Sequence, residues 1–207
     1  MEIIPLNYGK SVLSEKMIFL GGDENKFRKI VFKVYLIKTE QKVILVDVGC
    51  ETMPGFIMDD FIGTIQALKN INVCPEEITD VIITHSHHDH IECVKYFKNA
   101  VIHIENSEYN YGKKYIPDSF KLNKFIDRFK ICENVTAIKI GGHSIGSCIV
   151  EVKKSNKIYI IAGDECYLRE CLDKKIPTGS YYDKEKSEDF IKMYSDKKYD
   201  VLMCHDE

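Results

Sequence analysis

One short segment of the sequence holds four of the seven histidines: Thr84-His85-Ser86-His87-His88-Asp89-His90. Just before it, the β-branched run at residues 80–83 predicts a buried strand. Just after it, Ile91, Val94 and Phe97 recur at roughly helical spacing, which predicts a helix. The histidines are therefore expected on the turn after the carboxyl end of a strand, where α/β proteins commonly present ligands and chemistry.

The residue types in this segment indicate metal binding. Neutral imidazole and carboxylate are ligands that a divalent ion such as zinc accepts. His85 and His87, two residues apart, can bind one ion together, whereas Asp89 and His90 can point at a second. A solvated polar loop is the alternative, but so many neighbouring imidazoles would repel one another on protonation and gain nothing.

Length and composition exclude several classes of protein. The 207 residues suit a single domain over 1–207 with a sizeable core. The net charge of −3 gives no broad electrostatic reason to expect nucleic acid or an anionic membrane as partner. The sequence shows no signal peptide and no apolar run of membrane-spanning length, so we expect a cytoplasmic protein.

The eight cysteines lie scattered, mostly in or beside apolar runs, and none forms a CxxC pair. This usage favours buried thiols in a reducing compartment over a disulfide framework. Cys50 and Cys204 fall near candidate ligands, and the sequence does not say whether either affects the site.

The remaining pattern predicts two sheets packed together with helices outside. The expected strands, besides 80–83, are residues 17–20, 30–37, 43–46, 101–104, 135–140, 148–152, 158–161 and 201–203. The expected helices are residues 61–71, 106–115 (capped by Asn106 or Ser107), 120–132 and 187–194, with a helical turn at 75–77. Polar turns are expected at 39–42 and 154–156.

Polar residues also follow four other strands. His143 lies between glycines that let the backbone bend tightly, and Asp164 follows an apolar strand and a glycine. His205 ends the last strand, and Asp47 ends another. A lone polar residue at a strand end is usually an ordinary cap or turn residue. Four such residues, together with a histidine cluster, favour a shared site.

These motifs resemble those of the metallo-β-lactamase superfamily. The HxHxDH signature lies at residues 85–90. The other motifs lie at residues 45–49, 142–146, 163–164 and 205, and all five are in the order found in the family. The resemblance covers essentially the whole chain. It implies an α/β fold of the αββα four-layer sandwich type, with two metal ions at the edge of the sheets.

The resemblance also implies a role for each ligand. His85, His87 and His143 would hold the first ion, Asp89, His90 and His205 the second, and Asp164 would bridge both. Asp47 would orient a ligand imidazole from behind. His88 falls on the variable position of the signature, so we do not expect it to be a ligand. His103 lies within a strand and is expected to be a core or surface residue.

A metal pair of this kind implies hydrolysis. Two divalent ions about 3.5–4 Å apart lower the pKa of a water held between them, so hydroxide becomes available near neutral pH to attack a carbonyl. The metals stabilise the resulting oxyanion, and Asp89 or Asp164 could carry a proton to the leaving group. Zinc is the first expectation, but these ligands also accept iron, manganese or cobalt.

The choice of substrate depends on finer features. A bridging aspartate disfavours true β-lactamases, and His87 stands where the flavin-linked di-iron oxygen reductases carry glutamate. Glyoxalase II thioesterases match the ligands but carry a C-terminal helical region, whereas this chain ends two residues after His205.

Tyr167, three residues after Asp164, is similar to the tyrosine of the quorum-quenching N-acyl homoserine lactonases, which helps to polarise the lactone carbonyl. Alternatively, Tyr167 is an amphipathic residue at a helix start.

We therefore expect a metal-dependent hydrolase that opens a small-molecule lactone or ester. A thioester hydrolase of the glyoxalase II kind, a phosphodiesterase and a non-catalytic metal-binding sensor are the alternatives. The short stretch at 51–77 and Ile145, where the family usually has proline, leave the acyl-chain preference open. The sequence does not predict the oligomeric state.

Overall fold

The computed structural model describes residues 1–207 as two compact units. Unit 1 comprises Met1–Ser11 and Val31–Phe125, and unit 2 comprises Val12–Ile30 and Ile126–Glu207. Two long strands, β1 (Glu2–Ser14) and β2 (Phe27–Lys38), contribute residues to both units.

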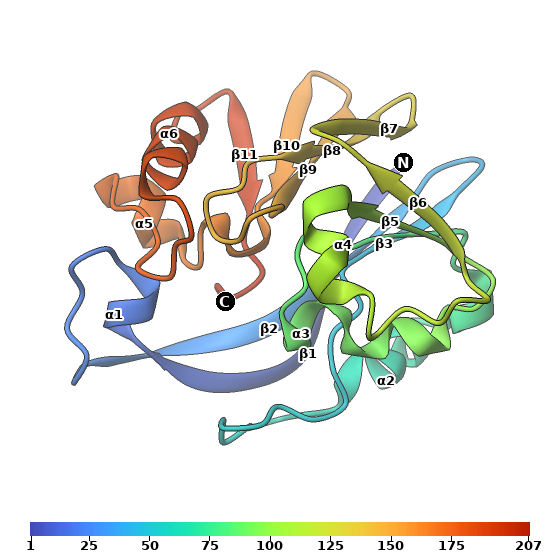
Figure 1. Cartoon of the computed structure of the whole chain (residues 1–207), viewed down its shortest axis with the longest axis horizontal. Coiled ribbons are helices and arrows are strands. Elements are labelled where there is room, and N and C mark those ends of the chain that lie inside the picture. Colours follow the sequence, from blue (N-terminus) through green and yellow to red (C-terminus); the bar gives the residue numbers. More distant parts are fainter. The chain divides into compact units, whose positions relative to one another are not determined.

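Unit 1 is built on a six-stranded sheet with the strand order β1-β2-β3-β4-β5-β6 (Figure 1). Its further strands are β3 (Val43–Val46), β4 (Asp80–Ile82), β5 (Val101–Glu105) and β6 (Lys121–Phe125). β2 and β3 are antiparallel, whereas β3 to β6 are parallel to one another. The continuous apolar runs of β3 and β4 are buried, as expected of parallel strands covered on both faces.

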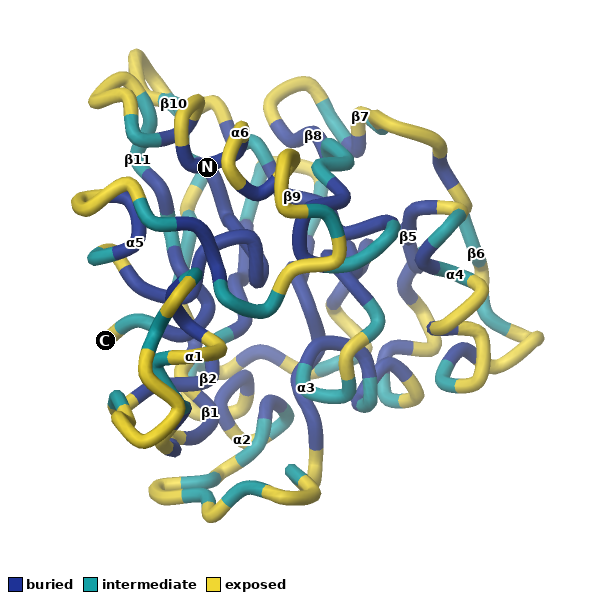
Figure 2. Tube along the Cα trace, turned by 60° about the vertical axis from the view of Figure 1, so that its left-hand side comes forward, coloured by how far each residue is buried: buried dark blue, intermediate teal, exposed yellow.

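Parallel neighbours need crossover segments, and helices supply them in unit 1. They are α2 (Gly63–Asn70), η1 (Pro75–Glu77), α3 (His88–Ile91), η2 (Glu92–Tyr96) and α4 (Asn106–Gly112). Figure 2 shows β5 buried, whereas β6 at the edge of the sheet is more exposed. Because β3 and β4 run in parallel, the segments that follow Val46 and Ile82 leave the same edge of the sheet. This places Asp47 beside the histidine segment.

Unit 2 is built on a five-stranded sheet with the order β11-β10-β9-β8-β7. Its strands are β7 (Arg128–Cys132), β8 (Val135–Lys139), β9 (Cys148–Lys154), β10 (Lys157–Ile161) and β11 (Tyr199–Leu202). Only the β10–β11 pair is parallel. The helices are α1 (Glu15–Ile18), η3 (Gly163–Glu165), α5 (Arg169–Lys174) and α6 (Lys184–Tyr194), and α5 packs against α6 (Figure 1).

Most expected elements are confirmed, but the helix expected at 120–132 is wrong. The segment forms β6 and β7, separated by a turn in which Asp127 has a φ of 56°. In β7, Phe129 and Ile131 alternate with exposed Arg128 and Lys130, a two-residue period that the apolar spacing of 122–129 had obscured.

The strand expected at 17–20 is also wrong, because α1 occupies its first two residues and a bend and a turn follow. The Ser14 hydroxyl accepts a hydrogen bond from the Lys16 amide (3.3 Å) and caps this short helix. The cap expected for α4 lies one residue earlier than predicted. The Glu105 carboxylate accepts bonds from the amides of Ser107 (2.6 Å) and Glu108 (3.3 Å).

None of the eight cysteines is disulfide-bonded, and six of them are buried. Burial, followed by the charge of Asp89, raises the pKa of the Cys50 thiol to about 12. This thiol is therefore neutral near pH 7 in the metal-free protein. No helix of the chain combines the length and the apolar character needed to cross a bilayer.

A buried charge network ties β3, β4 and β5 together at the start of β4. The Asp80 carboxylate accepts bonds from Lys42 Nζ (2.8 Å), His103 Nε2 (2.8 Å) and the Thr79 hydroxyl (2.7 Å). The other ring nitrogen of His103 lies 3.1 Å from Asn123 Nδ2. His103 is thus a core residue, as expected. Burial raises the pKa of Asp80, but the bonds from His103, Lys42 and Thr79 outweigh it and lower the pKa to about 2.

Asp80→Asn should therefore destabilise the protein in a pH-dependent way. At pH 7 we expect a loss of about 3 kcal/mol in the free energy of unfolding, as for breaking a buried ion pair. The native pKa of about 2 lies below the ordinary 3.8, so the carboxylate contributes fully above about pH 5 and loses its contribution as the pH falls toward 2. Urea unfolding at a series of pH values should show the difference from the native protein shrink. Asp118→Asn, at an exposed position, is the control. A difference that is constant from pH 7 to pH 3 would contradict the expectation.

Candidate metal centre

The histidine segment follows β4 and runs into α3. His85 lies in the loop, His87 lies at the cap position of α3, and Asp89 and His90 lie within the helix. The amide of His90 donates to the carbonyl of His87 (3.0 Å), so the short helix fixes the spacing of these side chains. The expectation that the cluster joins a strand to a helix is confirmed.

Asp47 orients two of these imidazoles. It follows β3 with a φ of 59°, a left-handed conformation that aspartate tolerates better than most residues. Its Oδ2 accepts from His90 Nδ1 (2.8 Å) and from the Thr84 hydroxyl (2.8 Å). Because that hydroxyl donates its proton to Asp47, its oxygen accepts from His85 Nδ1 at 3.1 Å. Both His85 and His90 are thereby held with the proton on Nδ1 and the lone pair on Nε2.

The His85–His87 pair has the spacing of two ligands on one ion. His85 Nε2 lies 3.0 Å from His87 Nδ1. Two nitrogens bound to one tetrahedral zinc at 2.0–2.1 Å lie about 3.3 Å apart. The observed pair is close to that separation. Beside it, the Asp89 carboxylate lies 3.5 Å from His90 Nε2.

Two buried residues that the sequence did not single out support the segment. The Tyr8 hydroxyl donates to the carbonyl of Asp89 (2.7 Å). The Glu108 carboxylate accepts from the amide of Ser86 (2.9 Å). His88 is engaged elsewhere, with Nε2 2.9 Å from the carbonyl of Thr52.

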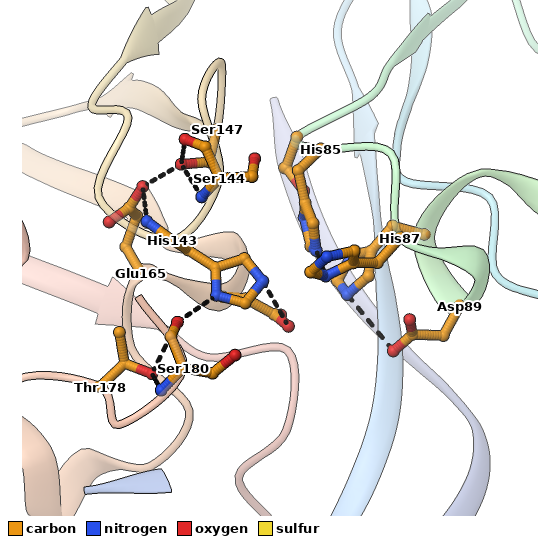
Figure 3. Close-up of polar contacts among 12 residues, drawn as sticks. His85, His87, Asp89, His143, Ser144, Ser147, Glu165, Thr178 and Ser180 are labelled. Atoms are coloured by element: carbon orange, nitrogen blue, oxygen red, sulfur yellow. Dashed lines mark hydrogen bonds and ion pairs between the residues drawn. The ribbon is translucent and has the colours of Figure 1, made fainter. Parts of the chain in front are cut away.

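Unit 2 gathers His143, Asp164 and His205 (Figure 3 shows His143). All three are buried, and each follows a strand of the five-stranded sheet. His143 Nδ1 donates to the carbonyl of Ser180 (2.6 Å), which leaves the lone pair on Nε2. His143 Nε2 lies 3.6 Å from Asp164 Oδ2, and His205 Nε2 lies 3.0 Å from Asp164 Oδ1. The two oxygens of one carboxylate thus face two different imidazoles.

Tyr167 packs between these imidazoles. Its ring stacks on His205 with centroids 5.1 Å apart and meets His143 edge-on at 6.1 Å. It directly precedes Leu168, the N-cap residue of α5, so it also lies at a helix start, as the alternative expected. The structure places the tyrosine against two candidate ligands.

The carboxyl of Glu165, next to Asp164, is fully buried and was not predicted as a site residue. Burial raises its pKa to about 7, although bonds from Ser147, His143 and Gly142 act in the opposite direction. The sequence signal was only a second acidic residue after the strand, which does not distinguish a buried carboxyl from an exposed one.

Comparison with known proteins identifies the family. Residues 33–205 match the profile of the metallo-beta-lactamase superfamily. The chain belongs to the metallo-β-lactamase superfamily. The fold expected from the resemblance is therefore confirmed as mixed sheets with helices, and the chain is a metal-dependent hydrolase.

Individual members of the superfamily are similar over most of the chain. A probable metallo-hydrolase of Methanocaldococcus jannaschii is 29% identical over 163 residues, covering 79% of this chain and 70% of the relative. An N-acyl homoserine lactonase of Bacillus cereus is 28% identical over 174 residues, covering 71% and 68%. A solved N-acyl homoserine lactone hydrolase, with its product N-hexanoyl-L-homoserine at the catalytic metal centre, superposes with a TM-score of 0.85. It is 19% identical and covers 99% of this chain and 92% of that one, so it supports the fold alone.

The residues present fit the metal ions that the superfamily implies. In unit 1, the Asp47 carboxylate fixes the protonated nitrogen of His90, and in unit 2 the Ser180 carbonyl does so for His143. A hydrogen bond of this kind behind an imidazole is typical of a metal ligand, because it orients the ring and raises its basicity. These buried imidazoles and carboxylates are a donor set for a borderline divalent ion.

Proposed function

We propose that this chain is a hydrolase that uses two divalent metal ions to open a small-molecule lactone or ester. The proposed ligands are His85, His87 and His143 for one ion, Asp89, His90 and His205 for the other, and Asp164 for both. The observation that carries the proposal is the Asp164 carboxylate, whose two oxygens face His143 and His205 separately. A carboxylate with one oxygen directed to each of two ligands is suited to bridging two ions.

When bound, the ions would supply Lewis acidity and lower the pKa of a water molecule toward neutrality. The chain itself supplies orientation and proton handling. Asp47 and Ser180 hold His90 and His143 in one tautomer, so each ring offers Nε2 without rearrangement. Asp89, next to His90 and with a more exposed side chain than His90, is suited to carry a proton to the leaving group. Asp164 is the other carboxylate that could do so.

Tyr167 favours a lactone over the other substrates. Its ring is fixed by stacking on His205, so its hydroxyl can hold one orientation toward a substrate carbonyl. The similarity to the N-acyl homoserine lactonase of Bacillus cereus supports the same preference. Zinc is the proposed metal, and residues 1–207 are proposed to act as one catalytic domain.

Elemental analysis of the purified protein, combined with a substrate panel, tests the proposal. We expect about two equivalents of zinc or a similar ion per chain and hydrolysis of N-acyl homoserine lactones. Chelation should remove the activity, and added metal should restore it.

The panel should include simple esters, a glutathione thioester and a phosphodiester, with heat-unfolded protein plus zinc as the control. Hydrolysis of the thioester or the phosphodiester alone would replace the lactone proposal. Metal binding with no turnover on any substrate would indicate a sensor, and metal-loaded protein that cleaved none of them would end the hydrolase proposal.

A further inference from the structure

Glu165 is a buried carboxyl that lies behind a proposed ligand. Its side chain has no solvent exposure, and its Oε1 accepts three hydrogen bonds (Figure 3). The donors are the amide of Gly142 (3.2 Å), the amide of His143 (3.3 Å) and the hydroxyl of Ser147 (2.5 Å). One oxygen therefore ties both ends of the turn that carries His143.

Other hydrogen bonds inside the turn join Ser144 to Ser147: the Ser144 amide donates to Ser147 Oγ (3.0 Å), and the Ser147 amide donates to the carbonyl of Ser144 (3.2 Å). The amides of Ile140 and Gly141 both donate to the carbonyl of Ser147, at 2.8 and 2.9 Å, and close the base of the turn. The next two amides, of Gly142 and His143, point to Glu165 instead of to a strand. A buried amide without an acceptor costs free energy comparable with a lost hydrogen bond, so removing Glu165 should free the turn to rearrange.

The other side of the turn is held by the segment that leads into α6. The carbonyl of Gly142 accepts from the amides of Tyr182 (2.7 Å) and Asp183 (2.9 Å). The carbonyl of Ser180 accepts from His143 Nδ1 (2.6 Å). His143 is thus fixed from two directions: by this segment through its ring and by Glu165 through its backbone.

The second oxygen of Glu165 explains why residue 142 is glycine. Glu165 Oε2 is buried and has no hydrogen-bond partner, and the same is true of Ser187 Oγ on α6. A Cβ on Gly142 would lie against Glu165 Oε2 and 2.7 Å from Ser187 Oγ. Both oxygens therefore face the space that the missing side chain leaves, and any larger residue would push Glu165 away from the turn.

We propose that Glu165 is a positioning residue that sets the orientation of His143 for metal binding. It acts through the amides of Gly142 and His143 and through the Ser147 hydroxyl. The proposal rests on the proposed function, in which His143 is a metal ligand. It concerns the acceptor oxygen of Glu165: Glu165→Gln keeps one carbonyl oxygen for the turn, whereas Glu165→Ala removes the acceptor.

Metal affinity and amide exchange in these variants test the proposal. We expect Glu165→Ala to weaken the binding of one of the two ions by about 10–100-fold, measured by competition with a chromophoric chelator, and Glu165→Gln to stay within about threefold of the native protein. In metal-free protein, NMR should show the Gly142 and His143 amides of Glu165→Ala exchanging at least about tenfold faster, with the amides of β9 unchanged. Glu185→Ala, at an exposed position on α6, is the control.

Each outcome decides the question. Native affinity and native amide exchange in Glu165→Ala would overturn the proposal, and so would equal losses in the Ala and Gln variants, because the charge would then matter instead of the acceptor. If Glu165→Ala does not fold, Ser147→Ala removes one of the three donors to Glu165, together with the acceptor of the Ser144 amide. A smaller loss of affinity there supports the proposal, and native affinity overturns it. If the native protein binds no metal, the proposed function fails, while the amide exchange still reports on the role of Glu165 in holding the turn.

Discussion

Asp164→Ala is expected to abolish hydrolysis and to lower the metal content of the protein. The variant removes the one carboxylate whose oxygens face both His143 and His205. Metal ions in such sites contribute several kcal/mol of transition-state stabilisation, so kcat/KM should fall by at least about 10³-fold. The loss should persist when excess zinc is supplied, because Asp164 would be needed to hold both ions together and not only to raise their occupancy.

Two further variants separate this effect from a general loss of structure. Asp189→Ala removes an exposed aspartate on α6 and should behave as the native protein. Asp164→Asn keeps the shape and one acceptor oxygen, so its activity should lie between those of the native protein and of Asp164→Ala. Circular dichroism and unfolding midpoints would show whether each variant is folded. A folded Asp164→Ala variant with native turnover and native metal content would exclude Asp164 from the centre.

The HxHxDH segment could be recognised in the sequence because its candidate ligands are local. His85, His87, Asp89 and His90 lie within six residues, so their chemistry is visible before any fold is known. Asp47 and Asp164 were predicted from a less direct signal, which was their position after an apolar strand. Packing explains a carboxylate at such a position poorly. Parallel pairing of β3 with β4 then brings Asp47 to the loop that carries the histidines.

Other residues of the site carried no such signal. Tyr8, Glu108 and Glu165 act on segments 18 to 81 positions away, through hydrogen bonds that only the tertiary structure reveals. Nothing in the surrounding sequence separates the buried Glu165 from an ordinary surface carboxylate. Burial and partners, rather than residue type, give these residues their roles.

The helix predicted at 120–132 was wrong because the apolar pattern of this segment fits more than one structure. Apolar residues at 122, 125, 126 and 129 satisfy a helical period. The same residues also fit two short strands joined by a turn, and periodicity alone does not choose between them. Pairing of β6 with β5 and of β7 with β8 decided the outcome. The left-handed conformation of Asp127 made the sharp turn possible, as aspartate is one of the few side chains that tolerates it.

Asp47→Asn is expected to weaken metal binding by about 10–100-fold, as is typical when a partner behind a ligand is removed. Three donors face this carboxylate: the Thr84 amide (2.7 Å), the Thr84 hydroxyl (2.8 Å) and His90 Nδ1 (2.8 Å). An asparagine offers only one oxygen, and its amide group would meet one of these donors with a donor of its own. His90 and, through Thr84, His85 would both lose the bond that fixes their tautomer.

The backbone is not expected to cause this loss, because asparagine also tolerates the left-handed conformation of residue 47. Asp127→Asn makes the same change at an exposed position with a φ of 56°, so it is a matched control that should leave metal affinity unchanged. Chelator competition would measure the affinity, and the ring ¹⁵N shifts of His85 and His90 in metal-free protein would report the tautomers. Native shifts together with native affinity in Asp47→Asn would show that the two imidazoles are oriented without Asp47. Altered shifts with native affinity would show that the tautomer does not limit metal binding. Only the joint change of shifts and affinity follows from the chain of bonds that runs from Asp47 through Thr84 to His85.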